Sequence, residues 1–207
     1  MENKYPVSYI SRLRMGIDGH GIRTLILFQG CSLRCQHCLN PFTWNESREA
    51  KMMTVKEMYE IIRIDRPYIL ATNGGVTFGG GEPLLHSEAI KEFAQLNKNP
   101  FSIYVETSLN VPREKLEMII DVIDRYYVDI KSTDPEIYEK YTGGDLQAVL
   151  DNLKYLMDCV GSEKVIVRIP TIQGLVNEEK QRQSKEYLKS FGVRNFDLFE
   201  YKILNEI

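Results

Sequence analysis

The sequence predicts an α/β fold built on a parallel sheet. Six stretches rich in β-branched and aromatic residues alternate along the chain with amphipathic segments of helical periodicity. This alternation is typical of repeated strand–helix–strand units. Right-handed connections curl such a sheet into a partial barrel or wind it into an open sheet, and periodicity does not choose between the two. In both architectures the functional site lies at the carboxyl ends of the strands.

Three strands are expected in the first half of the chain. Residues 24–30 (TLILFQG) form a buried strand, and a capping box at Thr54 opens the helix that follows. Residues 75–80 (GVTFGG) form the second strand, before a helix that we expect Ser87 to cap. Residues 101–107 (FSIYVET) form the third strand. A helix therefore separates each strand from the next, as parallel pairing requires.

The second half continues the alternation. Pro112 begins a helix of residues 112–124, and Asp145 caps a helix of residues 146–161. The remaining elements are a strand of residues 126–132, a strand of residues 164–172, a charged surface helix of residues 177–191 and a strand of residues 195–204. Polar residues follow most of the strands, so we expect them to converge on one rim of the sheet.

Length and composition limit the class of protein. A chain of 207 residues can bury a core of its own, and we expect one domain over residues 1–207. The net charge is −3, so nothing favours nucleic acid or an anionic membrane as a partner. Residues 1–16 lack the apolar run of a signal peptide, and no apolar run approaches the ~18 residues that span a bilayer. We therefore expect a cytoplasmic protein, in which clustered cysteines are metal ligands or reactive thiols.

Three cysteines, Cys31, Cys35 and Cys38, share the short segment GCSLRCQHCLN that follows the first predicted strand. Three thiolates on one loop bind a soft metal or an iron–sulfur cluster. A structural zinc site takes four ligands, and the remaining cysteine, Cys159, is expected to be a packed core thiol. A zinc site completed by a histidine, His37 or His86, remains an alternative. A four-iron cluster with three thiolates keeps one iron open, which suits catalysis.

The segment GGGEP follows the second predicted strand and supplies a second group of candidates. Gly80 and Gly81 let a backbone approach a ligand closely, because no Cβ intervenes. The carboxylate of Glu82 can accept charge-assisted hydrogen bonds from an ammonium group. The alternative is an ordinary glycine turn with a solvated glutamate. A phosphate loop fits less well, since no Gly-Lys-Ser/Thr follows.

Two long motifs carry a resemblance to a known family. DGHGIRTLILFQGCSLRCQHCLNPFTW (18–44) and GGVTFGGGEPLL (74–85) resemble the radical S-adenosylmethionine (radical SAM) superfamily. More narrowly, they resemble its glycyl-radical-enzyme activating family, typified by pyruvate formate-lyase activating enzymes. The resemblance implies a partial (β/α)6 barrel with helices outside and a [4Fe–4S] cluster on the three clustered cysteines. S-adenosyl-L-methionine would bind the open iron.

The same resemblance implies the reaction and the partners. An electron from the cluster splits S-adenosylmethionine into methionine and a 5′-deoxyadenosyl radical. In the activating branch this oxidoreductase chemistry is anaerobic, and the radical takes a hydrogen from a glycine of a partner, a glycyl-radical enzyme. A flavodoxin- or ferredoxin-like protein would donate the electron.

The resemblance also assigns cofactor-binding residues. His37 and Leu39 are candidates near the nucleoside, with the His37 ring stacked on adenine. Lys131 would face the nucleoside, while Asp129 would join Thr107 in a monovalent-cation site beside the cofactor carboxylate. Arg168 (in RIP) interrupts an apolar strand, so its charge needs a partner, and the cofactor carboxylate or ribose is the candidate.

Several positions depart from the family pattern. Glu106 stands where the family has aspartate, and Tyr127 stands near a position often held by methionine, which bears on the cation site. His20 replaces the usual proline of the first motif, and Lys202 replaces a histidine near the cofactor. Two other functions stay open at this point. One is a small-molecule radical enzyme, such as a carbon–nitrogen rearranging or ring-contracting synthase, and the other is a non-enzymatic zinc-binding module.

Overall fold

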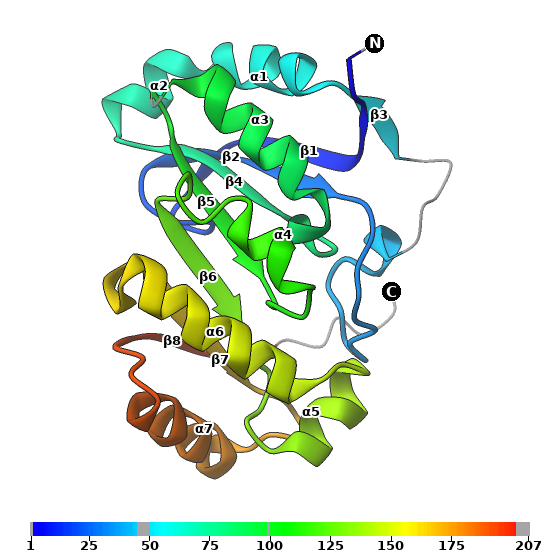
Figure 1. Cartoon of the computed structure of the whole chain (residues 1–207), viewed down its shortest axis with the longest axis vertical. Helices are drawn as coiled ribbons and strands as arrows, with labels where there is room; N and C mark the ends of the chain where they lie inside the picture. Colours follow the sequence, from blue (N-terminus) through cyan, green and yellow to red (C-terminus); the bar gives the residue numbers. More distant parts are fainter. Residues whose placement is uncertain (1, 45–49, 99, 202–207) are drawn as a thin grey trace.

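The computed structural model has one sheet of eight strands, and it describes residues 2–44, 50–98 and 100–201. The strands are β1 (Tyr5–Met15), β2 (Ile22–Phe28), β3 (Lys51–Met53), β4 (Gly75–Gly80), β5 (Ser102–Thr107), β6 (Arg125–Asp129), β7 (Val165–Thr171) and β8 (Asn195–Glu200). The helices are α1 (Val55–Arg63), α2 (Arg66–Ala71), α3 (Ser87–Asn97), α4 (Arg113–Glu117), α5 (Pro135–Thr142), α6 (Leu146–Val160) and α7 (Glu178–Ser190). Figure 1 shows their arrangement.

The strand order is β3-β1-β2-β4-β5-β6-β7-β8. Neighbours from β2 to β8 are parallel, and each pairs with the next parallel strand along the chain. The predicted α/β fold with six parallel strands is confirmed. The sheet is open, with β3 and β8 at its two edges, as a partial barrel requires.

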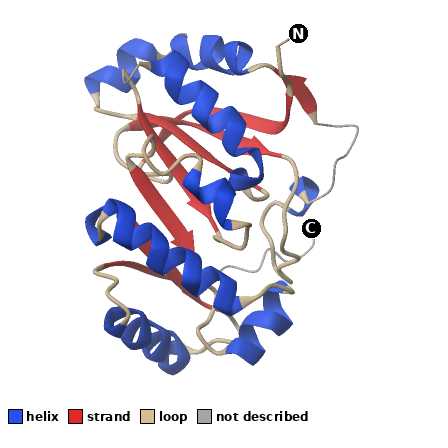
Figure 2. Cartoon of the chain, viewed as in Figure 1, coloured by secondary structure: helices blue, strands red, loops and turns tan. Residues whose placement is uncertain are grey.

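One face of the parallel strands packs on the helices, several of which lie in front of the sheet in Figure 2. The other face is polar toward the carboxyl ends, because side chains alternate between the faces along a strand. On three neighbouring strands the core-facing residues are Val105, Val128 and Val167, all fully buried. The residues that follow them, Glu106, Asp129 and Arg168, line a cavity instead.

Two strands were not predicted. β1 runs antiparallel to β2 and to the short β3, and so extends the sheet beyond its parallel part. Its pairing with β2 has two register shifts, which interrupt the regular alternation that sequence analysis depends on. β1 matters for function, because several of its side chains reach the cavity.

Some helix boundaries agree with the prediction and others differ. Thr54 forms the expected capping box, and Asp145 accepts hydrogen bonds from two N–H groups at the start of α6. Ser87 does not cap α3. It is the first residue of that helix, and its hydroxyl donates to two backbone carbonyls. Pro112 is the N-cap of α4, which has five residues rather than the expected thirteen. The unpredicted α5 is capped by Asp134.

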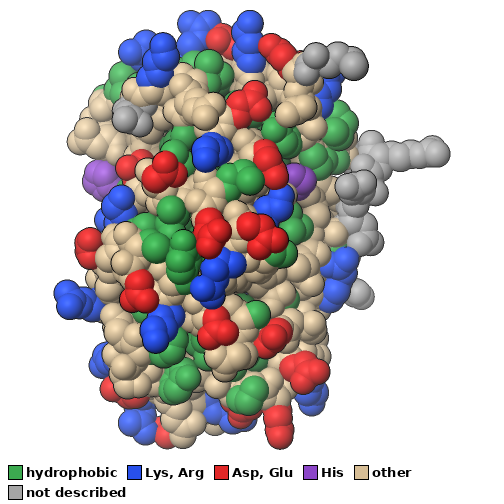
Figure 3. All heavy atoms as spheres, in the orientation of Figure 1, with side chains coloured by type: hydrophobic (Ala, Val, Ile, Leu, Met, Phe, Trp, Pro, Cys, Tyr) green, Lys and Arg blue, Asp and Glu red, His purple; other side chains and the backbone are tan. Residues whose placement is uncertain are grey.

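The last predicted strand, residues 195–204, is described only in part. β8 covers its first six residues and ends at Glu200, and residues 202–204 lie outside the described part of the chain. Acidic and basic side chains are interspersed over the face shown in Figure 3. None of the helices within the described residues is both long and apolar enough to cross a membrane.

Candidate functional site

The three clustered cysteines lie on the loop that leaves the carboxyl end of β2. Backbone N–H groups of Arg34 and Gln36 donate to carbonyls in the last turn of α5 (2.8 and 3.0 Å), which fixes the middle of the loop. Cys31, Cys35 and Cys38 are each partly buried and line one cavity of about 670 Å³. The predicted convergence of the three thiols on one space is therefore present.

Backbone N–H groups and burial determine how readily these thiols ionise. Sγ of Cys31 accepts a hydrogen bond from Leu33 N, and Sγ of Cys38 accepts one from Asn40 N, both at 3.4 Å. Burial raises the pKa of Cys31 to about 12 and that of Cys35 to about 11. Such thiols ionise near neutral pH only when a bound metal stabilises the thiolate.

The donor set fits an iron–sulfur cluster better than a single zinc ion. Within residues 2–44, 50–98 and 100–201, no three His, Cys, Asp or Glu side chains lie close enough together to hold one metal ion. A zinc site needs its ligands to converge on one point, whereas a cubane takes each thiolate at a different iron. His86, a candidate fourth zinc ligand, has its Nε2 2.6 Å from the carbonyl oxygen of Gln29.

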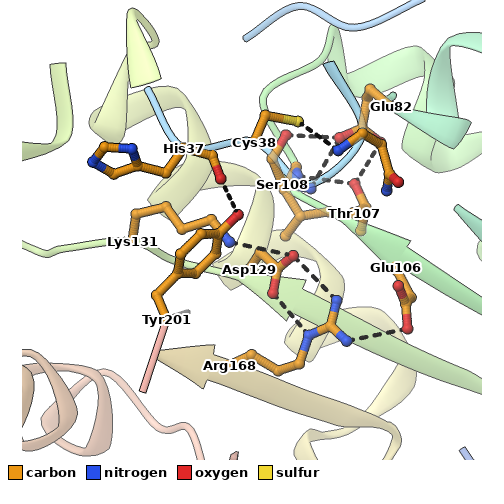
Figure 4. Close-up of polar contacts among 12 residues, drawn as sticks. His37, Cys38, Glu82, Glu106, Thr107, Ser108, Asp129, Lys131, Arg168 and Tyr201 are labelled. Atoms are coloured by element: carbon orange, nitrogen blue, oxygen red, sulfur yellow. Dashed lines mark hydrogen bonds and ion pairs between the residues drawn. The ribbon is translucent and has the colours of Figure 1, made fainter. Parts of the chain in front are cut away.

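The two candidates near the nucleoside are placed differently. Leu39 lines the cavity and is 54% exposed. The His37 ring is not among the lining side chains and lies beside the Tyr141 ring, with the centroids 5.9 Å apart. Figure 4 shows the ring directed away from Lys131 and the His37 carbonyl directed toward Tyr201. Stacking of His37 on adenine stays a prediction that this ring position does not favour.

The two glycines at the end of β4, Gly80 and Gly81, have a packing role that the sequence did not predict. A Cβ on Gly81 would lie 1.9 Å from the carbonyl oxygen of Gly30, at the start of the cysteine loop. Gly80 has φ +115°, and a Cβ there would meet the backbone of Phe28 at 2.6 Å. The N–H groups of Gly81 and Glu82 donate to Phe28 and Gly30 (3.1 and 2.8 Å). These glycines therefore hold the β4 rim directly against the cysteine loop.

Glu82 is buried beneath this rim, with 1% of its surface exposed. Its Oε1 accepts hydrogen bonds from the Thr107 hydroxyl (2.6 Å) and Leu84 N (3.2 Å). Its Oε2 accepts two more, from the Ser108 hydroxyl (2.7 Å) and Ser108 N (2.9 Å). Burial raises the pKa of Glu82 more than these bonds lower it. Glu82 thus ties the end of β4 to the end of β5, and Thr107 and Ser108 rather than Glu82 line the cavity.

Four charged side chains form a connected group at the carboxyl ends of β5, β6 and β7 (Figure 4). Asp129 and Arg168 are paired in register on neighbouring strands. Arg168 Nε and Nη2 donate to the two carboxylate oxygens of Asp129 (2.7 and 3.1 Å), and Nη1 donates to Glu106 Oε1 (3.1 Å). Lys131 Nζ lies 3.5 Å from Asp129 Oδ2. The expected common orientation of Asp129 and Lys131 is present, because both line the cavity.

The charges of this group stabilise one another. Burial would raise the pKa of Asp129, but Arg168 and Lys131 hold it below its usual value. Burial would likewise lower the pKa of Arg168, but Asp129 and Glu106 raise it. For Glu106 burial prevails, and its pKa is raised despite Arg168. Arg168 and Lys131 therefore keep Asp129 ionised inside the cavity wall, whereas burial opposes the ionised form of Glu106.

Sequence analysis missed the wall of the cavity that β1 provides. Tyr9 and Arg14 line the cavity from β1, and Asp18 lines it from the loop that follows. Arg14 donates two N–H groups to the carboxylate of Asp18 in an ion pair. Asp18 belongs to the DGHGIR motif, and this was the only feature of the sequence that pointed to a role for it. β1 itself was unpredicted, so nothing in the sequence placed these side chains opposite the cysteines.

Two aromatic residues at the end of β8, Phe199 and Tyr201, were also missed. Both line the cavity, with ring centroids 6.3 Å apart. The Tyr201 hydroxyl donates to the His37 carbonyl (2.6 Å), and Lys131 Nζ lies 5.5 Å from the centre of the Tyr201 ring. Lys202, the residue noted in the sequence at this end, lies outside the described residues.

Arg23 of the DGHGIR motif is buried, at 1% exposure, and forms no ion pair with a carboxylate of the described residues. Its guanidinium donates to two hydroxyls and three backbone carbonyls and lies 3.5 Å from the centre of the Tyr104 ring. The Thr77 hydroxyl, one of its acceptors, donates in turn to the carbonyl of Asp18 (2.9 Å). Arg23 therefore holds the motif against β4 and β5 from inside the sheet.

One prediction about the cysteines was wrong. Cys159 is exposed rather than packed in the core. The buried stripe of α6 includes Val149, Leu153 and Leu156, and Val160 rather than Cys159 continues it toward the end of the helix. The prediction relied on residue type alone, because free cysteine is usually buried.

Comparison with known proteins places these features in a family. The family model described as "Radical SAM superfamily" matches residues 25–182. The pyruvate formate-lyase-activating enzyme of Clostridium pasteurianum is 33% identical over 192 residues, which are 91% of this chain and 79% of that protein. The enzyme of the same name from Staphylococcus aureus (strain USA300) is 32% identical over 198 residues, 89% of this chain and 76% of that protein.

Solved structures share the fold. Streptococcus suis SuiB bound to S-adenosylmethionine has a TM-score of 0.65 at 15% identity, over 84% of this chain and 39% of that one. QueE from Escherichia coli has a TM-score of 0.54 at 14% identity, over 94% of this chain and 93% of that one. At such identities the similarity concerns the fold alone.

Proposed function

The chain belongs to the radical SAM superfamily and is an enzyme of the glycyl-radical-enzyme activating type, and we propose that it installs a glycyl radical on a partner enzyme. The radical would come from reductive cleavage of S-adenosylmethionine at a [4Fe–4S] cluster. One observation carries the proposal: Cys31, Cys35 and Cys38 line the same cavity as the rim of β4 and the charged ends of β5, β6 and β7. The cluster, the cofactor and a target hydrogen can meet only in such a shared space.

Cys31, Cys35 and Cys38 would hold the cluster. When bound, the cluster supplies one electron to the sulfonium of S-adenosylmethionine and offers an open iron to its amine and carboxylate. The loop contributes two N–H···S hydrogen bonds, from Leu33 and Asn40, which favour the thiolate form. Each of the three thiols is partly buried.

The methionine end of the cofactor would lie at the β4 rim. Gly80, Gly81, Thr107 and Ser108 line the cavity there. Glu82 positions Thr107 and Ser108 through three hydrogen bonds, and its buried carboxylate adds negative potential below the place where an ammonium would bind. A direct contact between Glu82 and the ammonium, as predicted from the sequence, requires one of its present donors to move.

The nucleoside end would lie between Leu39 and the end of β8. Leu39, Phe199 and Tyr201 supply apolar and aromatic surface, on which an adenine can stack. Lys131, beside Tyr201, supplies a charged donor to the same region. The partner's glycine would enter the cavity over the remaining wall, which β1 provides. We propose a flavodoxin- or ferredoxin-like protein as the electron donor, on the strength of the family alone.

Anaerobic reconstitution with iron and sulfide, followed by reduction with S-adenosylmethionine present, tests the proposal. We expect 5′-deoxyadenosine and methionine in equal amounts from the wild-type chain and none from Cys35→Ala. A glycyl-radical enzyme added to the mixture should then acquire a protein radical. Absence of 5′-deoxyadenosine from protein that carries a cluster would refute the proposal. If cleavage occurs but only a metabolite accepts the radical, the chain is a small-molecule radical enzyme.

A further inference from the structure

Two of the protein's own cations, Arg168 and Lys131, contact Asp129 of the predicted monovalent-cation site. We propose that the Arg168 guanidinium takes the place of a bound monovalent cation, so that S-adenosylmethionine binds this chain without added potassium or sodium. The inference rests on the proposed function, since it concerns the methionine end of the cofactor.

The oxygens that a cation would need are engaged. Both carboxylate oxygens of Asp129 accept hydrogen bonds from Arg168 (2.7 and 3.1 Å), and one of them lies 3.5 Å from Lys131 Nζ. The Thr107 hydroxyl donates to Glu82 (2.6 Å) and accepts from Leu109 N (2.9 Å). A cation bound to Asp129 and Thr107 would share oxygens that already accept hydrogen bonds from Arg168 and Leu109 N, and it would lie beside the guanidinium, whose positive charge repels it.

The charge balance also disfavours an added cation. When both carboxylates are ionised, Asp129 and Glu106 are matched by the two cations Arg168 and Lys131, and the group is neutral. All four side chains are at least three-quarters buried, with exposed fractions of 13–25%. A third positive charge would leave the group with a net charge of +1 in a place where water screens it poorly.

Glu106 explains why this chain can differ from the family pattern. The resemblance places an aspartate at this position, and glutamate is one methylene longer. The extra length lets Oε1 reach Arg168 Nη1 at 3.1 Å from the neighbouring part of the sheet. Asp129 and Arg168 are paired in register on β6 and β7, so the guanidinium is fixed by two strands rather than by a mobile loop. The fixed guanidinium therefore bridges both carboxylates.

Arg168 keeps donors for the cofactor. A guanidinium has five N–H groups, and three of them are used by Asp129 and Glu106. Arg168 and Lys131 both line the cavity, so the remaining N–H groups and the ammonium of Lys131 can bind the carboxylate of S-adenosylmethionine. A bound potassium ion would otherwise supply this positive charge.

Calorimetric titration of S-adenosylmethionine into the cluster-loaded chain, under anaerobic conditions, tests the inference. The titration is done in potassium chloride and in choline chloride at equal ionic strength, so that screening is the same. We expect the two dissociation constants to agree within about threefold. Tighter binding in potassium by more than about threefold would overturn the inference and leave the proposed function intact. Absence of binding in both salts would instead count against the proposed function.

The variant Arg168→Met and its control Arg182→Met provide a second test. Arg168→Met removes the guanidinium and vacates both carboxylates, so affinity in choline should fall by about tenfold or more. Potassium should then recover at least about threefold of the loss, because the vacated oxygens can bind it. Arg182→Met removes an exposed arginine of α7 (66% exposed) and should behave as the wild type. If potassium recovers nothing in Arg168→Met, the inference is wrong. If that variant does not fold, the wild-type comparison decides alone.

Discussion

The Tyr201 hydroxyl donates a 2.6 Å hydrogen bond to the carbonyl of His37, which lies 164 residues earlier in the chain. This bond joins the end of β8 to the cysteine loop, and Tyr201 itself lines the cavity. We expect Tyr201→Phe to keep the ring and its position near Lys131 but to lose about 0.5–1.5 kcal/mol of unfolding free energy. Urea unfolding measures the loss. Tyr187→Phe, at a tyrosine that is 46% exposed on α7, is the matched control and should change little. Equal stabilities of Tyr201→Phe and wild type would show that the bond does not hold the loop.

We expect the three cysteines of the loop and Cys159 to differ in their effect on iron content when each is replaced by alanine. Alanine at Cys31, Cys35 or Cys38 removes one of three ligands, so each variant should lose the cluster. Cys159→Ala, at the exposed cysteine of α6, should keep about four irons per chain after reconstitution. Iron analysis and the absorption spectrum of the reconstituted proteins measure this. A full cluster in Cys35→Ala would contradict the assignment of the ligands.

Glu82→Gln tests the link between β4 and β5. The amide replaces one acceptor oxygen by a donor that faces other donors, so we expect a loss of about 1–3 kcal/mol of unfolding free energy. The cluster should still bind, since no ligand changes, while affinity for S-adenosylmethionine should fall by roughly one to two decades. Glu88→Gln, at a half-exposed residue that pairs with Lys115, is the control and should cost little. Unchanged affinity for S-adenosylmethionine would show that Glu82 does not contribute to cofactor binding.

We expect the folding stability of wild type relative to Glu82→Gln to depend on pH when both proteins are free of cluster and cofactor. Burial raises the pKa of Glu82 above its usual 4.5, so the folded chain holds this proton more tightly than the unfolded chain. The stability of wild type relative to Glu82→Gln should therefore be greatest at or below pH 4.5 and should fall as the pH rises through the raised pKa. Denaturant unfolding of both proteins over a pH series measures the difference. A difference that rises with pH would mean that the four hydrogen bonds outweigh burial.

Arg23→Lys tests the anchoring of the DGHGIR motif. Lysine has three donors, whereas the buried Arg23 donates to five acceptors, so we expect a loss of roughly 2–4 kcal/mol of unfolding free energy. The loss should appear as a lower denaturation midpoint. Arg182→Lys on the exposed face of α7 should leave the midpoint nearly unchanged. A stable Arg23→Lys variant would show that the hydrogen bonds are replaceable.

The sequence predicted the parallel strands and the cysteine loop because both signals are local. Alternating strands and helices appear as a change of period, and the spacing of Cys31, Cys35 and Cys38 is fixed within eight residues. The contacts that depend on register were not predictable. The facing of Asp129 and Arg168 follows from the alignment of two strands that are separated by α5 and α6.

Other errors have equally physical causes. β1 is irregular, so the side chains that it contributes to the cavity had no periodic signal. Glu82 was expected to point to a ligand, but its burial and its four donors depend on where β5 ends. The resemblance predicted the family correctly, whereas the placement of the His37 ring could be seen only in three dimensions.

Transfer of deuterium from the partner's glycine is the decisive measurement for the proposed function. In that function the chain forms a 5′-deoxyadenosyl radical, which takes a hydrogen from a glycine of a partner protein. A glycyl-radical enzyme, with its glycine deuterated at Cα, would be incubated anaerobically with the reduced, cluster-loaded chain and S-adenosylmethionine. We expect one deuterium in the 5′-deoxyadenosine, seen by mass spectrometry, and a glycyl radical seen by electron paramagnetic resonance. 5′-Deoxyadenosine that carries no deuterium, with no radical on the partner, would contradict the proposed function.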